Sequence, residues 1–296
     1  MRSASATRKF NLANCLLGLF ILIFALVCIL PMLLTLIVSF TDESTLQRYG
    51  FSFFPKRFST AAYQMMFSKG SLVLHGYMIS IFVTVVGTVA ALVITALAAY
   101  TLADKNVKYR GLLGLLFFIP MMFSAGIVPW YLMCKQLGFY NNILALIIPS
   151  LLFNPFNLFL VRNYMQGIPD SLRESATIDG ASDLVIATRI YFPLAMPVLA
   201  TVGLFYALGY WNDWWNAIML VDDKNFYPIQ YMLQQLQSNV KMLQDMQLST
   251  HMYNGVLPAQ SLQMATVIIT VGPIALLYPF LQKYYIQGLV VGSVKE

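Results

Sequence analysis

The residues with the most informative types and spacing lie in a polar segment that separates two strongly apolar stretches. A carboxylate, a small residue, a glycine, an isoleucine and a proline stand there at fixed offsets, as Glu174, Ala176, Gly180, Ile190 and Pro193. A carboxylate can pair with a cation on another protein, while a glycine and a proline can set the direction of the chain. An ordinary loop with a helical hairpin is the alternative interpretation, but the fixed offsets favour a functional surface.

The local residue types in this segment predict two short helices joined by a tight turn. Pro169 has a φ suited to a first helical turn, and Asp170 places a carboxylate near the positive end of that helix. Gly180 can adopt the left-handed conformation that ends a helix. Either Ser182 or Asp183 can then cap the second helix, which leads into the next apolar stretch.

The composition is that of an integral membrane protein. Hydrophobic residues make up 59% of the chain and charged residues 10%, and the mean hydropathy is +0.70. Soluble domains carry about a quarter charged residues, and a transmembrane helix needs roughly 20 mostly apolar ones. We therefore predict an all-α fold of six transmembrane helices in one domain, residues 1–296. The six windows are residues 12–40, 77–103, 111–134, 143–161, 195–219 and 262–282.

The positions of the basic residues predict the orientation in the membrane. With a cytoplasmic N-terminus, the inner segments hold eleven of the 18 Lys and Arg residues. This places both termini and the loop 168–193 in the cytoplasm, and the loops 41–76 and 220–261 outside the cell. The net charge of +6 is then a property of topology, because the basic residues are spread over separate loops rather than gathered for nucleic acid.

The sequence gives this chain no means of hydrolysing ATP and no metal site. A phosphate-binding loop of the form G-x-x-x-x-G-K-[ST] does not occur, so we expect a chain that is not an enzyme. The three cysteines, Cys15, Cys28 and Cys134, lack metal-ligand spacing. Only Asp213 and His75 could serve an ion-coupled carrier, and both lie near predicted span ends, where a pairing role is favoured. Sodium coupling through backbone carbonyls stays open.

The polar segment resembles the cytoplasmic coupling loop of ABC importer permeases. Its signature is E-A-A, three residues, G, nine residues and I-x-L-P, from which only Ser175 and Phe192 depart. Three further segments are similar to carbohydrate importer permeases of the maltose-transporter class: residues 123–132, 211–215 and 278–289. The closing residues 288–296 are most similar to LplC-type oligosaccharide and polysaccharide permeases of Gram-positive bacteria.

The resemblance implies a type I ABC importer in a bacterial plasma membrane. Its expected partners are a second, usually different, permease subunit, two ATPase subunits that hold ATP and Mg, an extracellular solute-binding lipoprotein and a carbohydrate. The residues implied in coupling to the ATPase are Glu174, Ser175, Ala176, Asp179, Gly180, Ile190 and Pro193. The C-terminal residues implied in contact with the ATPase are Gly288, Gly292, Ser293 and Lys295.

The fifth and fourth windows contain the candidate substrate pathway. Sugar sites combine flat aromatic surfaces with side-chain amides, and both are present here. The candidates are Tyr210, Trp211, Asn212, Trp214, Trp215, Asn154 and Asn157. An aromatic belt at the outer membrane interface is the alternative interpretation of the tryptophans and tyrosines. A permease for another class of solute, and a secondary carrier or channel, are the alternative functions.

Overall fold

The computed structural model describes residues 12–68, 70–149, 151–250 and 259–275, and these residues form helices and connecting loops. Their only β-type pairing is an isolated bridge between Thr41 and Phe58, so the predicted all-α class is confirmed for the described residues. The chain divides into two compact units. The smaller unit comprises residues 1–68 and 237–271, and the larger unit comprises residues 69–236 and 272–296.

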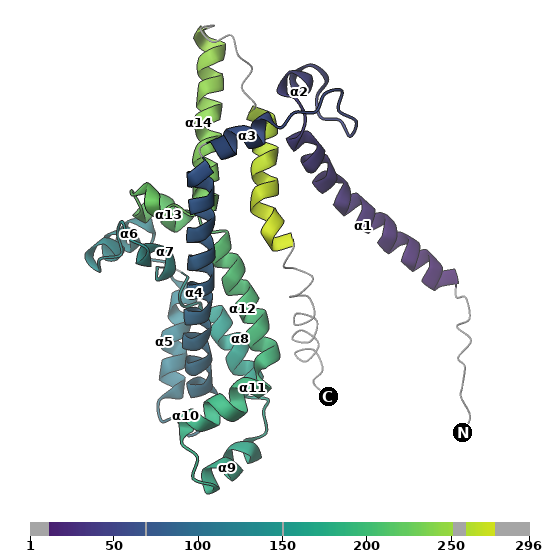
Figure 1. Cartoon of the computed structure of the whole chain (residues 1–296). Coiled ribbons are helices and arrows are strands. Elements are labelled where there is room, and N and C mark those ends of the chain that lie inside the picture. Colours follow the sequence, from purple (N-terminus) through teal and green to yellow (C-terminus); the bar gives the residue numbers. More distant parts are fainter. Residues whose placement is uncertain (1–11, 69, 150, 251–258, 276–296) are drawn as a thin grey trace. The chain divides into compact units, whose positions relative to one another are not determined.

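Four helices form the body of the larger unit (Figure 1). They are α4 (Gly70–Ala103), α5 (Arg110–Met122), α8 (Pro155–Met165) and α12 (Met196–Trp211). Helix α4 packs along both α12 and α8, and α5 contacts α4 and α8. Small residues permit the close approach: Gly87 on α4 lies under the ring of Tyr210 on α12. A Cβ at Gly87 would overlap the ring of Tyr210, which only glycine avoids.

Several predicted spans are broken into two helices. The third window contains α5 and α6 (Ile127–Gln136), separated at Gly126, whose φ is +83°. The fourth contains α7 (Leu144–Ile147) and α8, and the fifth contains α12 and α13 (Trp215–Leu220). Among the described residues, two helices are long and apolar enough to cross a membrane unbroken, within Leu16–Ser39 and Val73–Ala103, and a bent pair makes a third. The count of six spans stays a prediction.

The backbone groups freed at two of these breaks are satisfied by side chains. The Asn154 side chain accepts hydrogen bonds from the backbone of Phe156 (2.9 Å) and Asn157 (3.3 Å) at the start of α8. At the start of α13, one carboxylate oxygen of Asp213 accepts from the backbone N–H groups of Trp215 (3.1 Å) and Asn216 (3.2 Å). The contacts of Asn154 are those of an N-cap, and Asp213, which precedes the N-cap Trp214, satisfies the first N–H groups of α13 in the same way; such contacts permit helix ends inside apolar segments.

Hydrogen bonds join two loops of the larger unit, one after α6 and one after α13. The backbone N–H groups of Asp222 and Asp223 donate to the side-chain oxygen of Asn141 at 3.0 and 2.7 Å. The Tyr140 hydroxyl donates to Asp222 at 2.6 Å, and this bond is the main cause that raises the pKa of Tyr140 to about 12. His75 bonds the carbonyl oxygen of Asn225 at 2.7 Å, in the short helix Lys224–Phe226.

The smaller unit contains α1 (Leu12–Ser39), α2 (Glu43–Tyr49), α3 (Ala61–Ser68), part of α14 (Ile229–Thr250) and most of the helix Ala259–Ala275. Most of α1 exposes apolar side chains, as expected for a helix in lipid. The buried carboxylate of Glu43 accepts from the backbone of Gln260 and Ser261, both at 3.0 Å. This contact satisfies the N-terminus of the helix Ala259–Ala275.

Candidate functional site

Loop 168–193 begins with a helix whose two ends are set by the residues that the sequence indicates. Helix α9 spans Asp170–Ile178, and Pro169 is its N-cap, with φ −57° and ψ 129°. Gly180 has a φ of +76°. Its N–H donates to the carbonyl of Thr177, and the N–H of Ala181 donates to that of Ala176, both at 3.0 Å. This pair of bonds is a Schellman ending, which confirms the predicted glycine turn.

The second half of the loop is a helical run that turns sharply into α12. It comprises α10 (Asp183–Ile186), a π-helical turn (Ala187–Tyr191) and α11 (Phe192–Leu194). Of the two predicted caps, Ser182 holds the N-cap position, although its hydroxyl makes no capping hydrogen bond. Pro193 lies inside the last turn, and the run meets α12 at an angle of 83°. Prolines and π-helical turns are common at such bends.

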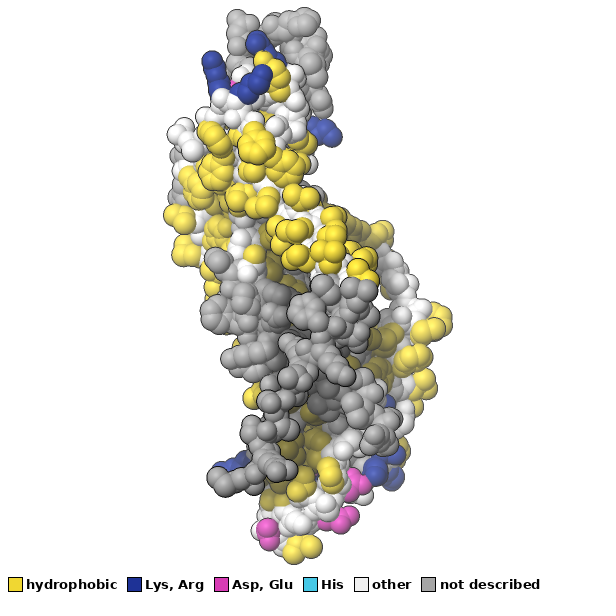
Figure 2. Space-filling view, turned by 90° about the vertical axis from the view of Figure 1, so that its right-hand side faces the viewer, with side chains coloured by type: hydrophobic (Ala, Val, Ile, Leu, Met, Phe, Trp, Pro, Cys, Tyr) yellow, Lys and Arg dark blue, Asp and Glu magenta, His cyan; other side chains and the backbone are white. Residues whose placement is uncertain are grey.

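The residues of the motif divide between an exposed face and a packed one. The exposed members are Glu174, Ser175, Asp179, Gly180 and Pro193, and the partly buried ones, Ala176 and Ile190, pack against the core of the larger unit. Apolar side chains are exposed beside them, above all Ile178, which is 86% exposed. Helices α9 and α10 lie at one end of the larger unit (Figure 1), and charged side chains gather at that end (Figure 2).

Ion pairs join α9 to its neighbours. One Arg173 nitrogen contacts Asp104, directly after α4, and another contacts Asp183 at 3.3 Å. Lys105 contacts Asp170 at 2.6 Å on the surface. Sequence reasoning missed these pairs. The one signal in the sequence was Arg173, the arginine next to the motif glutamate. Its pairing could not be predicted, because its partner Asp104 is distant along the chain.

An aromatic contact joins the π-helical turn to α4. The rings of Tyr191 and Tyr100 meet edge to face, with their centres 5.1 Å apart. Burial raises the pKa of Tyr191, and the cation of Arg173 acts in the opposite direction. The loop therefore has both polar and apolar contacts with the cytoplasmic end predicted for α4.

Three of the seven predicted substrate residues are buried within this chain. Trp211 is 8% exposed and contacts Tyr77, with the ring centres 6.2 Å apart. The buried hydroxyl of Tyr210 donates to the carbonyl of Ile147 at 2.8 Å. Asn157 is buried as well. In this conformation these side chains support the packing of the helices, and their role in a substrate pathway stays a prediction.

The other four predicted substrate residues are exposed. Trp214 and Trp215 are 38% and 41% exposed and lie edge to face, with centres 5.7 Å apart. Asn212 bonds the carbonyl of Leu208 at 2.9 Å and accepts from Gln230 at 3.4 Å. Asn154 is occupied in capping α8. The two tryptophans are therefore the members of the set with free aromatic surface.

The two candidates for an ion relay have structural partners. The second carboxylate oxygen of Asp213 accepts from the amide of Asn216 at 2.9 Å, in addition to its capping contacts. His75 bonds a loop carbonyl, as described above. Among the described residues no group of three or more His, Cys, Asp or Glu side chains could hold a metal ion. The predicted tail contacts, Gly288, Gly292, Ser293 and Lys295, lie outside the described residues.

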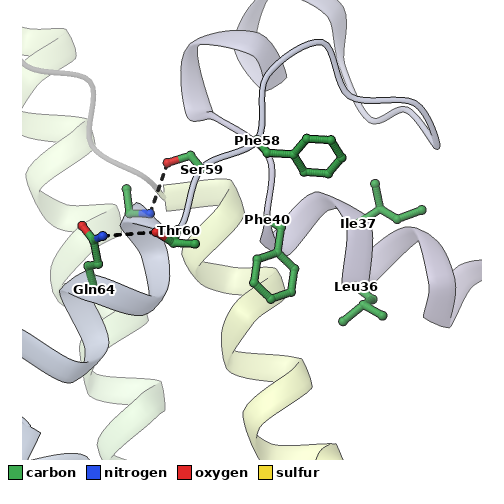
Figure 3. Close-up of a pocket in the computed structure, with 8 residues that line it drawn as sticks. Leu36, Ile37, Phe40, Phe58, Ser59, Thr60 and Gln64 are labelled. Carbon is green, nitrogen blue, oxygen red and sulfur yellow. Dashed lines mark hydrogen bonds between the residues drawn. The ribbon is translucent and has the colours of Figure 1, made fainter.

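A hollow of about 690 Å³ lies in the smaller unit, at the end of α1 (Figure 3). Its apolar wall is made by Leu36, Ile37, Phe40 and Phe58. Its polar groups bond within the protein: the Gln64 amide donates to Thr60, and the backbone of Ala61 donates to Ser59, both at 3.1 Å. An open apolar hollow with its polar groups already paired is poorly suited to a hydroxyl-rich ligand.

The chain is similar to a known protein family, to named relatives and to a solved structure. Residues 91–291 match the family described as binding-protein-dependent transport system inner membrane component. That match contains the whole of loop 168–193 and the broken fifth span.

Two relatives from Bacillus subtilis (strain 168) are similar along nearly the whole chain. Protein LplC is 40% identical over 297 residues, which cover 100% of this chain and 98% of the relative. The polygalacturonan/rhamnogalacturonan transport system permease protein YtcP is 37% identical over 289 residues, with coverages of 97% and 99%.

A solved structure is also similar. It is the crystal structure of a bacterial ABC transporter involved in the import of the acidic polysaccharide alginate. The matching chain superposes with a TM-score of 0.79 at 27% identity, and the match covers 96% of this chain and 100% of that one.

Proposed function

This chain belongs to the family of binding-protein-dependent transport system inner membrane components, and we propose that it is a permease subunit of an ATP-driven importer for an oligo- or polysaccharide. The observation that carries the proposal is the similarity along the whole chain to LplC, to YtcP and to a subunit of the alginate importer. YtcP and the alginate importer are both named for polymeric carbohydrates. The all-α permease fold predicted from the sequence agrees with the same superposition.

The exposed face of loop 168–193 supports docking of an ATPase subunit. An apolar side chain as exposed as Ile178 is costly in water, so a partner that covers it stabilises the assembly. Glu174 lies on the exposed face and has no ion-pair partner among the described residues, which leaves its carboxylate available to a cation of that partner. ATP and Mg belong to the partner chain, and this chain acts as a non-catalytic membrane subunit.

The bend between the loop and α12 supports a mechanical role. The run Asp183–Leu194 is one helical segment that meets α12 at 83°, so a displacement of the loop by closing ATPase subunits changes the orientation of a membrane helix. Alternating access to the two sides of the membrane requires such a displacement. The complete assembly then contains a second permease subunit, two ATPase subunits and an extracellular solute-binding lipoprotein.

The structural roles of Asp213 and His75 disfavour the alternative of an ion-coupled carrier. Asp213 caps a helix and His75 bonds a loop carbonyl, so neither is free to relay a proton without breaking its contacts. We place both termini and loop 168–193 in the cytoplasm of a bacterium, and the Bacillus relatives favour a Gram-positive one.

Reconstitution tests the proposed function. The permease pair, the ATPase subunits and the lipoprotein are placed in proteoliposomes, and uptake of rhamnogalacturonan, alginate and maltose oligosaccharides is measured. We expect uptake of at least one polymer-derived sugar with MgATP and none with a non-hydrolysable analogue. Uptake driven by an ion gradient without ATP would contradict the proposal. ATP-driven uptake of amino acids or peptides alone would favour the permease for another solute class.

A further inference from the structure

We propose that Arg173 is a positioning residue that joins the two halves of loop 168–193 to the end of α4, so that the loop and α4 move together. The inference rests on the proposed function, because it concerns how a displacement made by an ATPase reaches a membrane helix. In this role Arg173 holds the loop in place, while the exposed face of the loop contacts the ATPase.

The position of Arg173 sets it apart from the exposed face of α9. Its side chain is only 16% exposed, whereas Glu174, the next residue, is exposed. Asp104, its partner at the end of α4, is 9% exposed, and Asp183, its partner at the start of α10, is 76% exposed. The guanidinium therefore has one carboxylate in a protected site and one near solvent. A planar fork with separate N–H groups can contact both at once, which the single ammonium of a lysine does less well.

The two halves of the loop are attached to the larger unit in different ways. The second half buries Ile186, Ala187 and Tyr191, and Tyr191 packs against Tyr100 of α4. None of the residues of helix α9 is fully buried. Of its apolar side chains, only the partly buried Ala176 packs against the core of the larger unit. Apolar packing therefore fixes the second half, while α9 depends mainly on polar contacts.

Two ion pairs join α9 to the residues directly after α4, and their exposure to water decides which of them contributes more. The pair Lys105 and Asp170 is well exposed, at 67% and 56%, so water and salt screen it and its contribution is small. The pair Arg173 and Asp104 is shielded from water, and loss of Arg173 leaves the carboxylate of Asp104 without a compensating charge. Arg173 is consequently the contact through which a displacement of α9 reaches α4.

The contact with Asp183 adds the second half of the loop to the same connection. Asp183 is the first residue of α10, from which the helical run continues to the 83° bend at α12. One guanidinium thus joins α9, the end of α4 and the start of the segment that enters α12. The loop can then transmit its movement to both membrane helices as one body.

Spin-label distances in the complete complex test this role without a transported sugar. The labels are placed at exposed positions Thr101 on α4 and Ser171 on α9, away from Ile178, after replacement of the three native cysteines. Distances are measured without nucleotide and with a non-hydrolysable ATP analogue plus Mg. In the unsubstituted protein we expect one narrow distribution in both states. In Arg173→Gln we expect the distribution to broaden or shift when nucleotide is added, and the matched control Lys105→Gln should behave as the unsubstituted protein.

ATP consumption gives the second readout. We expect Arg173→Gln to assemble and to hydrolyse ATP, but to import at least about tenfold less sugar per ATP. The charge exchange Arg173→Asp with Asp104→Arg should recover part of this ratio, which distinguishes a specific pair from a general loss of stability. Distances and a transport ratio in Arg173→Gln equal to those of the unsubstituted protein would overturn the role of Arg173. ATP-independent uptake by the unsubstituted complex would instead overturn the proposed function.

Discussion

Loop 168–193 and the aromatic segment 206–216 belong to the same unit, but they use their polar and apolar groups in opposite ways. The loop leaves its motif carboxylate exposed and its most exposed apolar side chain, Ile178, almost uncovered. The aromatic segment buries Tyr210 and Trp211 and uses Asp213 to cap a helix inside a predicted span. The loop therefore leaves groups available for the contact with another chain that we propose, whereas much of the aromatic segment maintains a break in a predicted membrane span.

The comparison shows that the type of a residue does not by itself determine its role. Both regions contain the groups that their predicted functions require, and only the surroundings show which groups remain available. In the loop the exposed groups include most members of the motif. In the aromatic segment the groups available for stacking are reduced mainly to Trp214 and Trp215. Substitutions in the two regions should consequently fail in different ways.

The largest effect is expected at Gly87, where the packing of α4 against α12 leaves no room for a side chain. In Gly87→Leu the new side chain would occupy the space of the Tyr210 ring, which is held by its bond to Ile147. Overpacking of this kind costs about 1–3 kcal/mol or more, and we expect little folded protein after purification. Size-exclusion profiles and thermal unfolding in detergent measure this. The control Gly114→Ala on α5, where a Cβ meets no atom within 4 Å, should leave both unchanged.

The next effect concerns the turn of the loop and should abolish transport without loss of the fold. Gly180 has a φ of +76° and open space around it, so Gly180→Val adds backbone strain of about 1–2 kcal/mol but no clash. The strain acts on the end of α9, next to the exposed face. We expect ATP-driven uptake to be lost while thermal unfolding of the membrane helices changes little. Full uptake by this variant would show that the turn does not position a docking surface.

A charge reversal on the exposed face should act on assembly with the partner. Glu174 is exposed and has no ion pair among the described residues, so Glu174→Lys should change the stability of this chain by less than about 0.5 kcal/mol. We expect uptake to fall at least about tenfold, with Glu174→Gln intermediate. Uptake is normalised to assembled complex. Equal uptake by all three proteins would remove Glu174 from the docking surface.

The smallest effects on uptake per assembled complex should separate the buried tryptophan from the exposed ones. Trp211→Ala removes a buried ring and should lower stability by about 3–5 kcal/mol if the cavity does not collapse, with no change in substrate preference. Trp214→Ala and Trp215→Ala should leave stability nearly unchanged and alter the relative uptake of oligosaccharides of different lengths. Identical length preference in both exposed variants would instead favour an interfacial belt.

Local features of the loop were predictable from the sequence, and contacts between distant segments were not. Gly180 ends α9 as its residue type suggests, because the left-handed turn depends on a few neighbouring residues. The pairing of Arg173 with Asp104 depends on how α4 and α9 pack, which no local pattern encodes. The break at Asp213 was hidden because a hydropathy window averages a capping residue with its apolar neighbours.

The central claim is that the exposed face of loop 168–193 receives an ATPase subunit. Photo-cross-linking from position 178 in intact membranes tests it most directly, because Ile178 is the most exposed apolar side chain of the loop. The account predicts a cross-link to the nucleotide-binding subunit of the assembly, lost in Glu174→Lys and absent from the exposed control position Leu112 on α5. Active uptake by a complex in which position 178 cross-links to no ATPase subunit would contradict it.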